Sequence, residues 1–209
     1  NLKVSEWVQG NDTNLDQQRD NVVLVEVFQV NCPGCFMYGI PEAIEIFNKY
    51  KSKDVSVLGV ATAFEDFDKN TLKNLELLVE TGKVIGETEK MLSQYGQLDG
   101  DKITYKIPYP IAMDSLIKQS DDVTKEQMDS LIKKQIPDFD TQPENYKNEI
   151  YDRVKNYFLS KEYSAETFEM YALPGTPSSI LIDRNGVLRD ISFGQNGSLE
   201  SKIQNLLNE

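Results

Sequence analysis

The chain has 209 residues, 39% of them hydrophobic, which is enough to bury the core of one elaborated domain. Its 22 Lys and Arg against 34 Asp and Glu give a formal net charge of −12, which repels phosphate backbones and anionic lipids. Nucleic acid is therefore not an expected partner. No apolar run approaches the roughly 20 residues of a membrane span, so we expect no stable membrane insertion of this chain.

The first third of the chain alternates strand and helix patterns. A short strand is predicted near Val4–Val8, and the β-branched run Val22–Phe28 predicts a buried central strand. A helix is expected to follow Cys35 and to run to about Tyr50, kinked at Pro41, and Val55–Thr62 predicts the next strand. A crossover of helical length between two strands implies right-handed parallel pairing.

The later segments predict helices over 71–80 and 84–95, a short strand over 109–113 and a closing amphipathic helix after residue 198. Ser179–Asp183 and Val187–Phe193 predict a hairpin, because Asn185-Gly186 offers the two positive-φ positions of a tight turn. Residues 115–169 are charged, with helical periodicity and no strand signals. We therefore expect a domain formed by 1–114 and 170–209, with 115–169 as an inserted helical subdomain.

The only two cysteines of the chain directly follow the predicted central strand, in the sequence Cys32-Pro33-Gly34-Cys35. If Cys32 caps the next helix, Pro33 takes its first position, and the free N–H groups and helix dipole stabilise a Cys32 thiolate. Cys35 lies one turn later and can attack a mixed disulfide held on Cys32. The pair predicts thiol–disulfide exchange, with Cys32 as the nucleophile and Cys35 as the resolving thiol.

The cysteine pair has three other interpretations. A structural disulfide closing so short a loop would constrain little unfolded-chain entropy. A zinc or iron–sulfur site is close to excluded, because the chain has no histidine and no third cysteine, so we expect no metal and no cofactor. A thiol peroxidase stays open as an alternative, although Gln29 stands where peroxiredoxins place a threonine before the reactive cysteine.

A second segment, Leu173 to Ser179, holds two prolines just before a predicted strand, and on composition alone it is an ordinary turn with trans proline bonds. Its position after the cysteine motif and the proline-containing helix changes that interpretation. Taken in order, these segments resemble the thioredoxin superfamily, most closely the TlpA-like and redoxin branch of thiol-disulfide oxidoreductases. The resemblance covers about residues 4–114 and 170–209.

The resemblance implies an α/β, thioredoxin-like fold, in which a central mixed β-sheet is flanked by helices and carries the helical insertion. It implies that Pro177 is a cis-proline facing the cysteine pair, with the backbone of Thr176 available to an extended substrate segment. Together with Pro33 and Gly34, these are the expected substrate-binding residues.

Glu26 lies six positions before the first cysteine, inside the apolar strand. Burial would raise its pKa and let it accept a proton from Cys35 during attack on the mixed disulfide. The resemblance assigns it the same role. A solvent-facing glutamate stays open as the alternative, because the sequence does not fix which side of the strand it occupies.

The resulting prediction is an enzyme that exchanges disulfides with protein substrates and is recharged by an upstream redox partner. Asn31 stands where the family commonly has tryptophan, and no histidine lies between the cysteines, so we expect a reductant or balanced exchanger rather than a strong oxidant. The alternative is a thioredoxin-fold binding module whose cysteine pair is a redox switch.

The family branch and the absence of other cysteines favour an extracytoplasmic location, periplasmic or secreted, with a cytoplasmic one still open. Because the sequence begins at Asn1 rather than Met, the absence of a signal segment at its start carries no weight.

Overall fold

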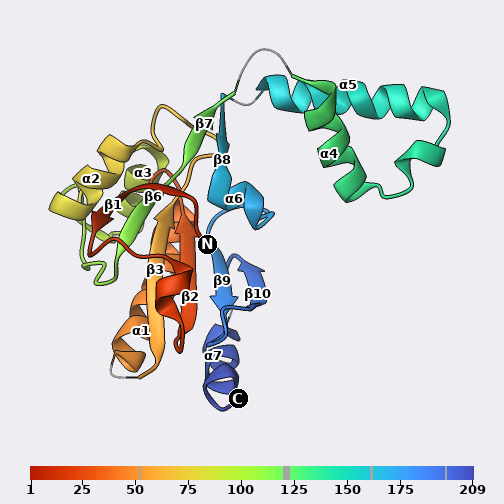
Figure 1. The fold of residues 1–209 in the computed structure, drawn as a ribbon. Coiled ribbons are helices and arrows are strands. Elements are labelled where there is room, and N and C mark those ends of the chain that lie inside the picture. The colour runs from red at the N-terminus through yellow and green to blue at the C-terminus, as the bar shows by residue number, and fades with distance from the viewer. Residues whose placement is uncertain (52, 120–122, 161, 196) are drawn as a thin grey trace. The chain divides into compact units, whose positions relative to one another are not determined.

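The computed structural model describes residues 1–51, 53–119, 123–160, 162–195 and 197–209. Its centre is a six-stranded mixed sheet in the order β1-β6-β3-β2-β9-β10 (Figure 1). The strands are β1 (Val4–Gln9), β2 (Val22–Phe28), β3 (Val55–Ala61), β6 (Ile111–Asp114), β9 (Ser178–Ile182) and β10 (Leu188–Phe193). Within the described part of the chain, no helix is long and apolar enough to cross a membrane.

Helices and short helical turns connect these strands, and one helix follows the last of them. They are the 3-10 helix η1 (Leu15–Gln18), the π-helix η2 (Cys35–Gly39), α1 (Ile40–Tyr50), α2 (Leu72–Thr81), α3 (Gly86–Gln94), α6 (Glu166–Met170) and α7 (Leu199–Leu207). A small separate ribbon pairs β4 (Leu98–Asp99) with β5 (Lys102–Ile103). The predicted fold class, a mixed sheet flanked by helices, is confirmed.

β2 lies inside the sheet and all seven of its residues are buried. It pairs in parallel with β3, from Val22 opposite Val55 to Phe28 opposite Ala61, as the helical crossover predicted. On its other side β2 pairs antiparallel with β9, which brings the segment before β9 next to the segment after β2.

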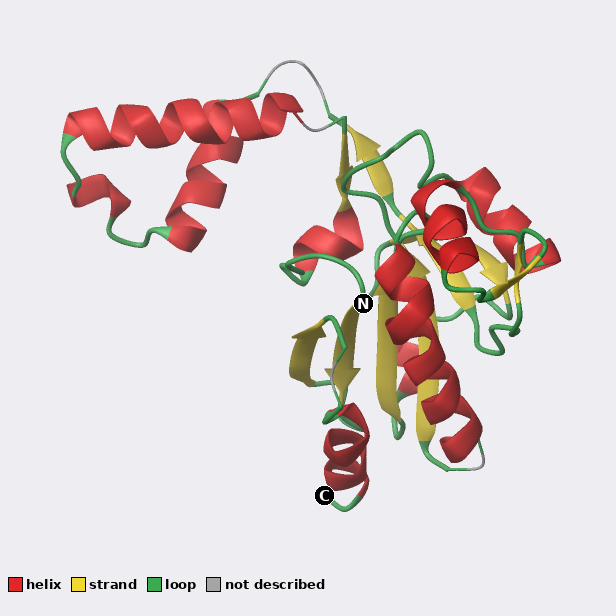
Figure 2. Cartoon of the chain, turned by 180° about the vertical axis from the view of Figure 1, so that it is seen from behind, coloured by secondary structure: helices red, strands yellow, loops and turns green. Residues whose placement is uncertain are grey.

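The alternation of side chains along β2 divides the core into two layers. Leu24 and Phe28 belong to the layer that includes residues of α1 and α7, whereas Val25 and Val27 belong to the layer on the opposite face of the sheet. Figure 2 shows α1 lying along the sheet. Glu26 has the same parity as Leu24 and Phe28, so its side chain lies on the α1 side.

The predicted hairpin is present as β9 and β10, but its turn differs from the expected one. Only Gly186 has a positive φ, of 76°, and Asn185 does not. The Asp183 side chain explains the difference, because it accepts hydrogen bonds from the backbone N–H groups of Asn185 and Val187, both at 2.9 Å. These bonds favour a longer turn that needs one left-handed residue instead of two.

The chain divides into two compact units, one formed by residues 1–116 and 165–209 and the other by 117–164. The second unit contains α4 (Lys125–Gln135), η3 (Phe139–Thr141) and α5 (Glu144–Ser160), and its small core includes the buried Ile132 and Phe139. The expectation that 115–169 holds no strand is wrong, because β7 (Leu116–Lys118) pairs with β8 (Tyr163–Ala165). Three residues are too few to show a strand periodicity. The boundaries 115 and 169 stay a prediction.

Candidate active site

Cys32 and Cys35 are joined by a disulfide at the start of the helix that follows β2. Helical structure begins at Pro33, and the Cys35 N–H donates to both the carbonyl oxygen (3.0 Å) and the Sγ (3.2 Å) of Cys32. Cys32 therefore occupies the capping position of this helix. Cys35 is fully buried and Cys32 only partly, so a thiol arriving from solvent meets the Cys32 sulfur first.

The helix that carries Cys35 opens with the π-helical segment η2. The Ile40 N–H donates to the carbonyl of Cys35, five residues back, and the next residue, Pro41, has no N–H to donate. The Phe36 carbonyl is instead satisfied by the Tyr105 hydroxyl, which donates to it at 2.8 Å. Next to Pro41, where a kink is predicted, the structure has a π-helical segment, which the Tyr105 hydroxyl supports from outside the helix.

Glu26 is 1% exposed and lies inside the core. Its Oε2 accepts a hydrogen bond from the Ser179 hydroxyl at 2.9 Å, while Oε1 has no hydrogen-bond partner among the described residues. Burial raises the pKa of Glu26 to about 8, the Ser179 hydrogen bond opposes this shift, and the negative charge of Glu42 adds to it. The solvent-facing alternative for this side chain is thereby excluded.

The Thr176–Pro177 peptide bond is cis, as the resemblance implied, and its loop meets the start of the helix. The Thr176 carbonyl oxygen lies 3.6 Å from Cys32 Sγ. A Cβ added at Gly34 would lie 3.8 Å from Pro177 Cδ, so the two segments are in van der Waals contact. The start of the helix, at Cys32 and Gly34, therefore meets the loop residues Thr176 and Pro177. Pro33, between Cys32 and Gly34, is the first helical residue.

Gly39 brings Glu26 and the proline loop to the same point under the helix. A Cβ at this position would overlap Glu26 Oε1 and would lie 2.6 Å from Pro177 Cβ. Only glycine allows so close an approach. The Glu26 carboxyl group thus packs against Gly39, which lies one helical turn after Cys35 in the same helix.

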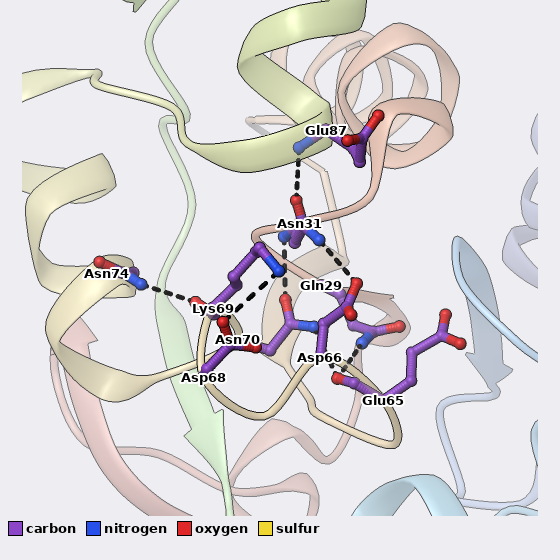
Figure 3. Close-up of polar contacts among 9 residues, drawn as sticks. All are labelled: Gln29, Asn31, Glu65, Asp66, Asp68, Lys69, Asn70, Asn74 and Glu87. Carbon is purple, nitrogen blue, oxygen red and sulfur yellow. Dashed lines mark hydrogen bonds and ion pairs between the residues drawn. The ribbon is translucent and has the colours of Figure 1, made fainter.

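Sequence analysis missed a group of polar residues around the cysteine motif, drawn in Figure 3. Gln29 is only 2% exposed. Its Oε1 accepts a hydrogen bond from the Thr176 hydroxyl at 3.1 Å, and its Nε2 donates one to the Glu65 carbonyl at 3.3 Å. Asn70 is 1% exposed and accepts from the Asn31 N–H. The available signal was the run of amide side chains directly after a buried strand. Among the described residues, no group of three or more His, Cys, Asp or Glu side chains is placed to hold a metal ion.

Comparison with known proteins agrees with this geometry. Over its whole length the chain is similar to a thiol-disulfide isomerase from Corynebacterium glutamicum, with 26% identity and a TM-score of 0.61 over 95% of that structure. A thioredoxin-like superfamily protein has 24% identity and a TM-score of 0.60 over 94% of its length. The exposed lipoprotein thioredoxin Etrx1 of Streptococcus pneumoniae shares the fold at 14% identity and a TM-score of 0.50, with all of this chain and 97% of that one covered. No family model and no curated protein sequence matches the chain.

The sheet order, the disulfide at a helix start and the facing cis-proline define a thiol-disulfide oxidoreductase. Its fold and its site are those of the thioredoxin superfamily, to which the similarity to the thiol-disulfide isomerase at 26% identity also points. The predicted superfamily and the predicted enzyme class, a thiol-disulfide oxidoreductase, are confirmed.

Proposed function

We propose that the chain exchanges disulfides with protein substrates through Cys32 and Cys35, as a member of the TlpA-like and redoxin branch. The observation that carries this proposal is the position of Cys32 Sγ, partly exposed, 3.2 Å from the Cys35 N–H and 3.6 Å from the Thr176 carbonyl. A thiolate at the start of a helix is stabilised by the free N–H groups and the positive end of the helix dipole.

In the reduced protein, the Cys32 thiolate attacks one sulfur of a substrate disulfide. A bond forms between Cys32 Sγ and that sulfur, the substrate S–S bond breaks, and its electron pair leaves on the other substrate sulfur, which takes a proton from water. Cys35 then loses its proton and attacks Cys32 Sγ. The mixed disulfide breaks and its electron pair leaves on the first substrate sulfur, so the substrate gains two electrons and the protein ends as the disulfide observed here.

Glu26 is the proposed acceptor of the Cys35 proton. Burial raises its pKa to about 8, so the Glu26 carboxylate is a stronger base than an exposed one and accepts a thiol proton more readily. In the reverse reaction the protonated Glu26 returns the proton to the leaving Cys35 thiolate. An upstream partner with a dithiol reduces the Cys32–Cys35 disulfide, is itself oxidised to a disulfide, and so restores the reduced form.

Thr176, Pro177, Pro33 and Gly34 form the proposed substrate contact. The Thr176 backbone lies beside Cys32 Sγ, in the bend that leads into β9. An extended peptide placed there can pair with the Thr176 backbone in the manner of an added strand, which puts one of its sulfurs at Cys32.

We propose a reductant or a balanced exchanger that works outside the cytoplasm. The absence of histidine between the cysteines supports weaker thiolate stabilisation than in a strongly oxidising site. Equilibration of the Cys32–Cys35 pair with glutathione tests the direction of electron flow. A reduction potential near the DsbA value of about −120 mV would refute it.

Reduction of insulin by dithiothreitol, with and without the protein, tests the enzymatic function. The wild-type chain should accelerate precipitation of the insulin B chain, and Cys32→Ser should abolish the acceleration. A wild-type chain that is inactive with every dithiol reductant would instead support a binding module. Rapid turnover of hydrogen peroxide, lost in Cys32→Ser, would support a thiol peroxidase.

A further inference from the structure

Asn31, the residue before the nucleophilic cysteine, is tied to two other segments of the chain. Its backbone N–H donates to Asn70 Oδ1 at 2.9 Å and its Nδ2 donates to Asp66 Oδ2 at 2.7 Å. Its Oδ1 accepts from the Glu87 N–H at 2.8 Å (Figure 3). Asn31 is only 9% exposed, so these bonds are largely shielded from water. Both polar atoms of its side-chain amide are thus hydrogen-bonded.

The bond to Glu87 makes Asn31 the cap of a second helix. Glu87 is the second residue of α3, and the residue before that helix, Ile85, has no side chain able to cap it. A Cβ at Gly86 would overlap Asn31 Oδ1, so the helix start and the asparagine are in direct contact. The hydroxyl of the neighbouring Thr88 donates a hydrogen bond to the Val30 carbonyl at 2.9 Å, which is a second link between α3 and the segment before Cys32.

The loop 65–70 holds the other two partners of Asn31 in place. Asp66 has a φ of +46°, in the left-handed region that residues other than glycine seldom adopt. Its carbonyl accepts from the N–H groups of Lys69 (2.8 Å) and Asn70 (2.9 Å), which offset the cost of that conformation. Asn70 also donates from Nδ2 to the Glu65 carbonyl at 2.9 Å. The loop therefore presents both acceptors to Asn31 in a fixed arrangement.

These contacts matter most when the disulfide is open. In the oxidised chain, the bond to Cys35 fixes the Cys32 sulfur regardless of the preceding residue. In the reduced chain that bond is gone, and the Cys32 backbone is held by the helix on one side and by Asn31 on the other. The hydrogen bonds of Asn31 should therefore stabilise the reduced form more than the oxidised form.

We propose that Asn31 is a positioning residue, which keeps the Cys32 sulfur of the reduced chain where the Cys35 N–H and the helix start stabilise its thiolate. The inference rests on the proposed exchange function and assigns part of its redox balance to this asparagine. Loss of the Asn31 side chain should raise the Cys32 pKa and shift the redox equilibrium toward the disulfide.

The test compares Asn31→Ala with Asn74→Ala in the full chain. Asn74 is a matched control, because its Nδ2 donates to the Lys69 carbonyl at 2.7 Å in the same loop, and in the described part of the chain no hydrogen bond joins its side chain to the segment 29–32. The equilibrium constant with glutathione and the absorbance of the Cys32 thiolate against pH are measured for each. Asn31→Ala should favour the disulfide at least fivefold and raise the Cys32 pKa, whereas Asn74→Ala should stay within twofold of wild type.

A purely structural role would destabilise the oxidised and reduced forms equally and leave the glutathione equilibrium of Asn31→Ala within twofold of wild type, which would overturn the proposal. If Asn31→Ala fails to fold, Asp66→Gly removes one partner and relieves the positive φ, and it should shift the equilibrium in the same direction at least twofold. No shift in that variant also overturns the proposal. Neither readout needs a protein substrate, so both remain decisive if the chain proves inactive on protein disulfides.

Discussion

Replacement of Glu26 by glutamine should remove a pH dependence from the free energy of unfolding. Burial gives this carboxyl group a pKa of about 8 in the folded chain, against 4.5 when exposed. Between these values the folded chain keeps a proton that the unfolded chain releases, so wild-type stability falls as the pH rises. The contribution is fully present below pH 4.5 and is lost above pH 8. Glutamine does not titrate in this range and can still accept the Ser179 hydrogen bond.

The size of the effect follows from the shift in pKa. A rise from 4.5 to about 8 corresponds to about 5 kcal/mol at 1.36 kcal/mol per unit, and about 3.5 kcal/mol of this stabilisation is lost between pH 5 and pH 8. Burial also raises the pKa of Asp114, but that group is present in both chains and cancels in their difference. The wild-type chain should therefore lose about 3.5 kcal/mol more than Glu26→Gln over this range.

Urea unfolding of the disulfide form at pH 5, 6.5 and 8 measures this difference. Ser179→Ala serves as a second probe, because loss of its hydrogen bond removes the interaction that lowers the Glu26 pKa and should make the fall in stability steeper. If the wild-type and Glu26→Gln stabilities change in parallel within about 0.5 kcal/mol, the carboxyl group does not titrate as a buried acid. The proton-transfer role would then lose its basis.

Two further substitutions test the packing of the active-site helix by urea unfolding. Gly39→Ala should lower the free energy of unfolding by about 2 kcal/mol, because the added Cβ overlaps buried atoms. The control Gly197→Ala, which has open space around it, should stay within about 0.5 kcal/mol of wild type. Equal effects of the two variants would refute the close approach of Gly39 to Glu26 and Pro177. Tyr105→Phe should cost about 1 to 2 kcal/mol by leaving the Phe36 carbonyl without a donor. Tyr95→Phe, at a position that is 64% exposed, should be neutral, and a neutral Tyr105→Phe would contradict the proposed support of the π-helical segment.

Local patterns predicted the parts of the fold that depend on neighbouring residues. The run Val22–Phe28 is β-branched and apolar because it lies inside the sheet, and the structure places β2 at those bounds. The parallel partner β3 followed from the length of the crossover. Prediction of the active site depended on the order of several separate segments, because nothing in Thr176-Pro177 alone distinguishes it from an ordinary turn.

The missed features depend on residues that are distant in sequence or on single side chains. Asn31 and Asp66 are 35 positions apart, and Tyr105 is 69 positions from the carbonyl to which it donates, so no local pattern links them. The hairpin turn was mispredicted because the Asp183 side chain, rather than the Asn-Gly pair, determines its conformation. The side of the sheet that Glu26 occupies became clear only with the packing of β2 against α1.

Identification of the sulfur that forms the mixed disulfide tests the exchange mechanism most directly. Reduced Cys35→Ser protein is mixed with a protein disulfide, quenched with acid and digested, and the covalent adduct is located by mass spectrometry. The partly exposed Cys32 should carry the substrate, and the reciprocal variant Cys32→Ser, which leaves only the buried Cys35, should form little adduct. An adduct mainly on Cys35, or none on either variant, would contradict the assignment of Cys32 as the nucleophile.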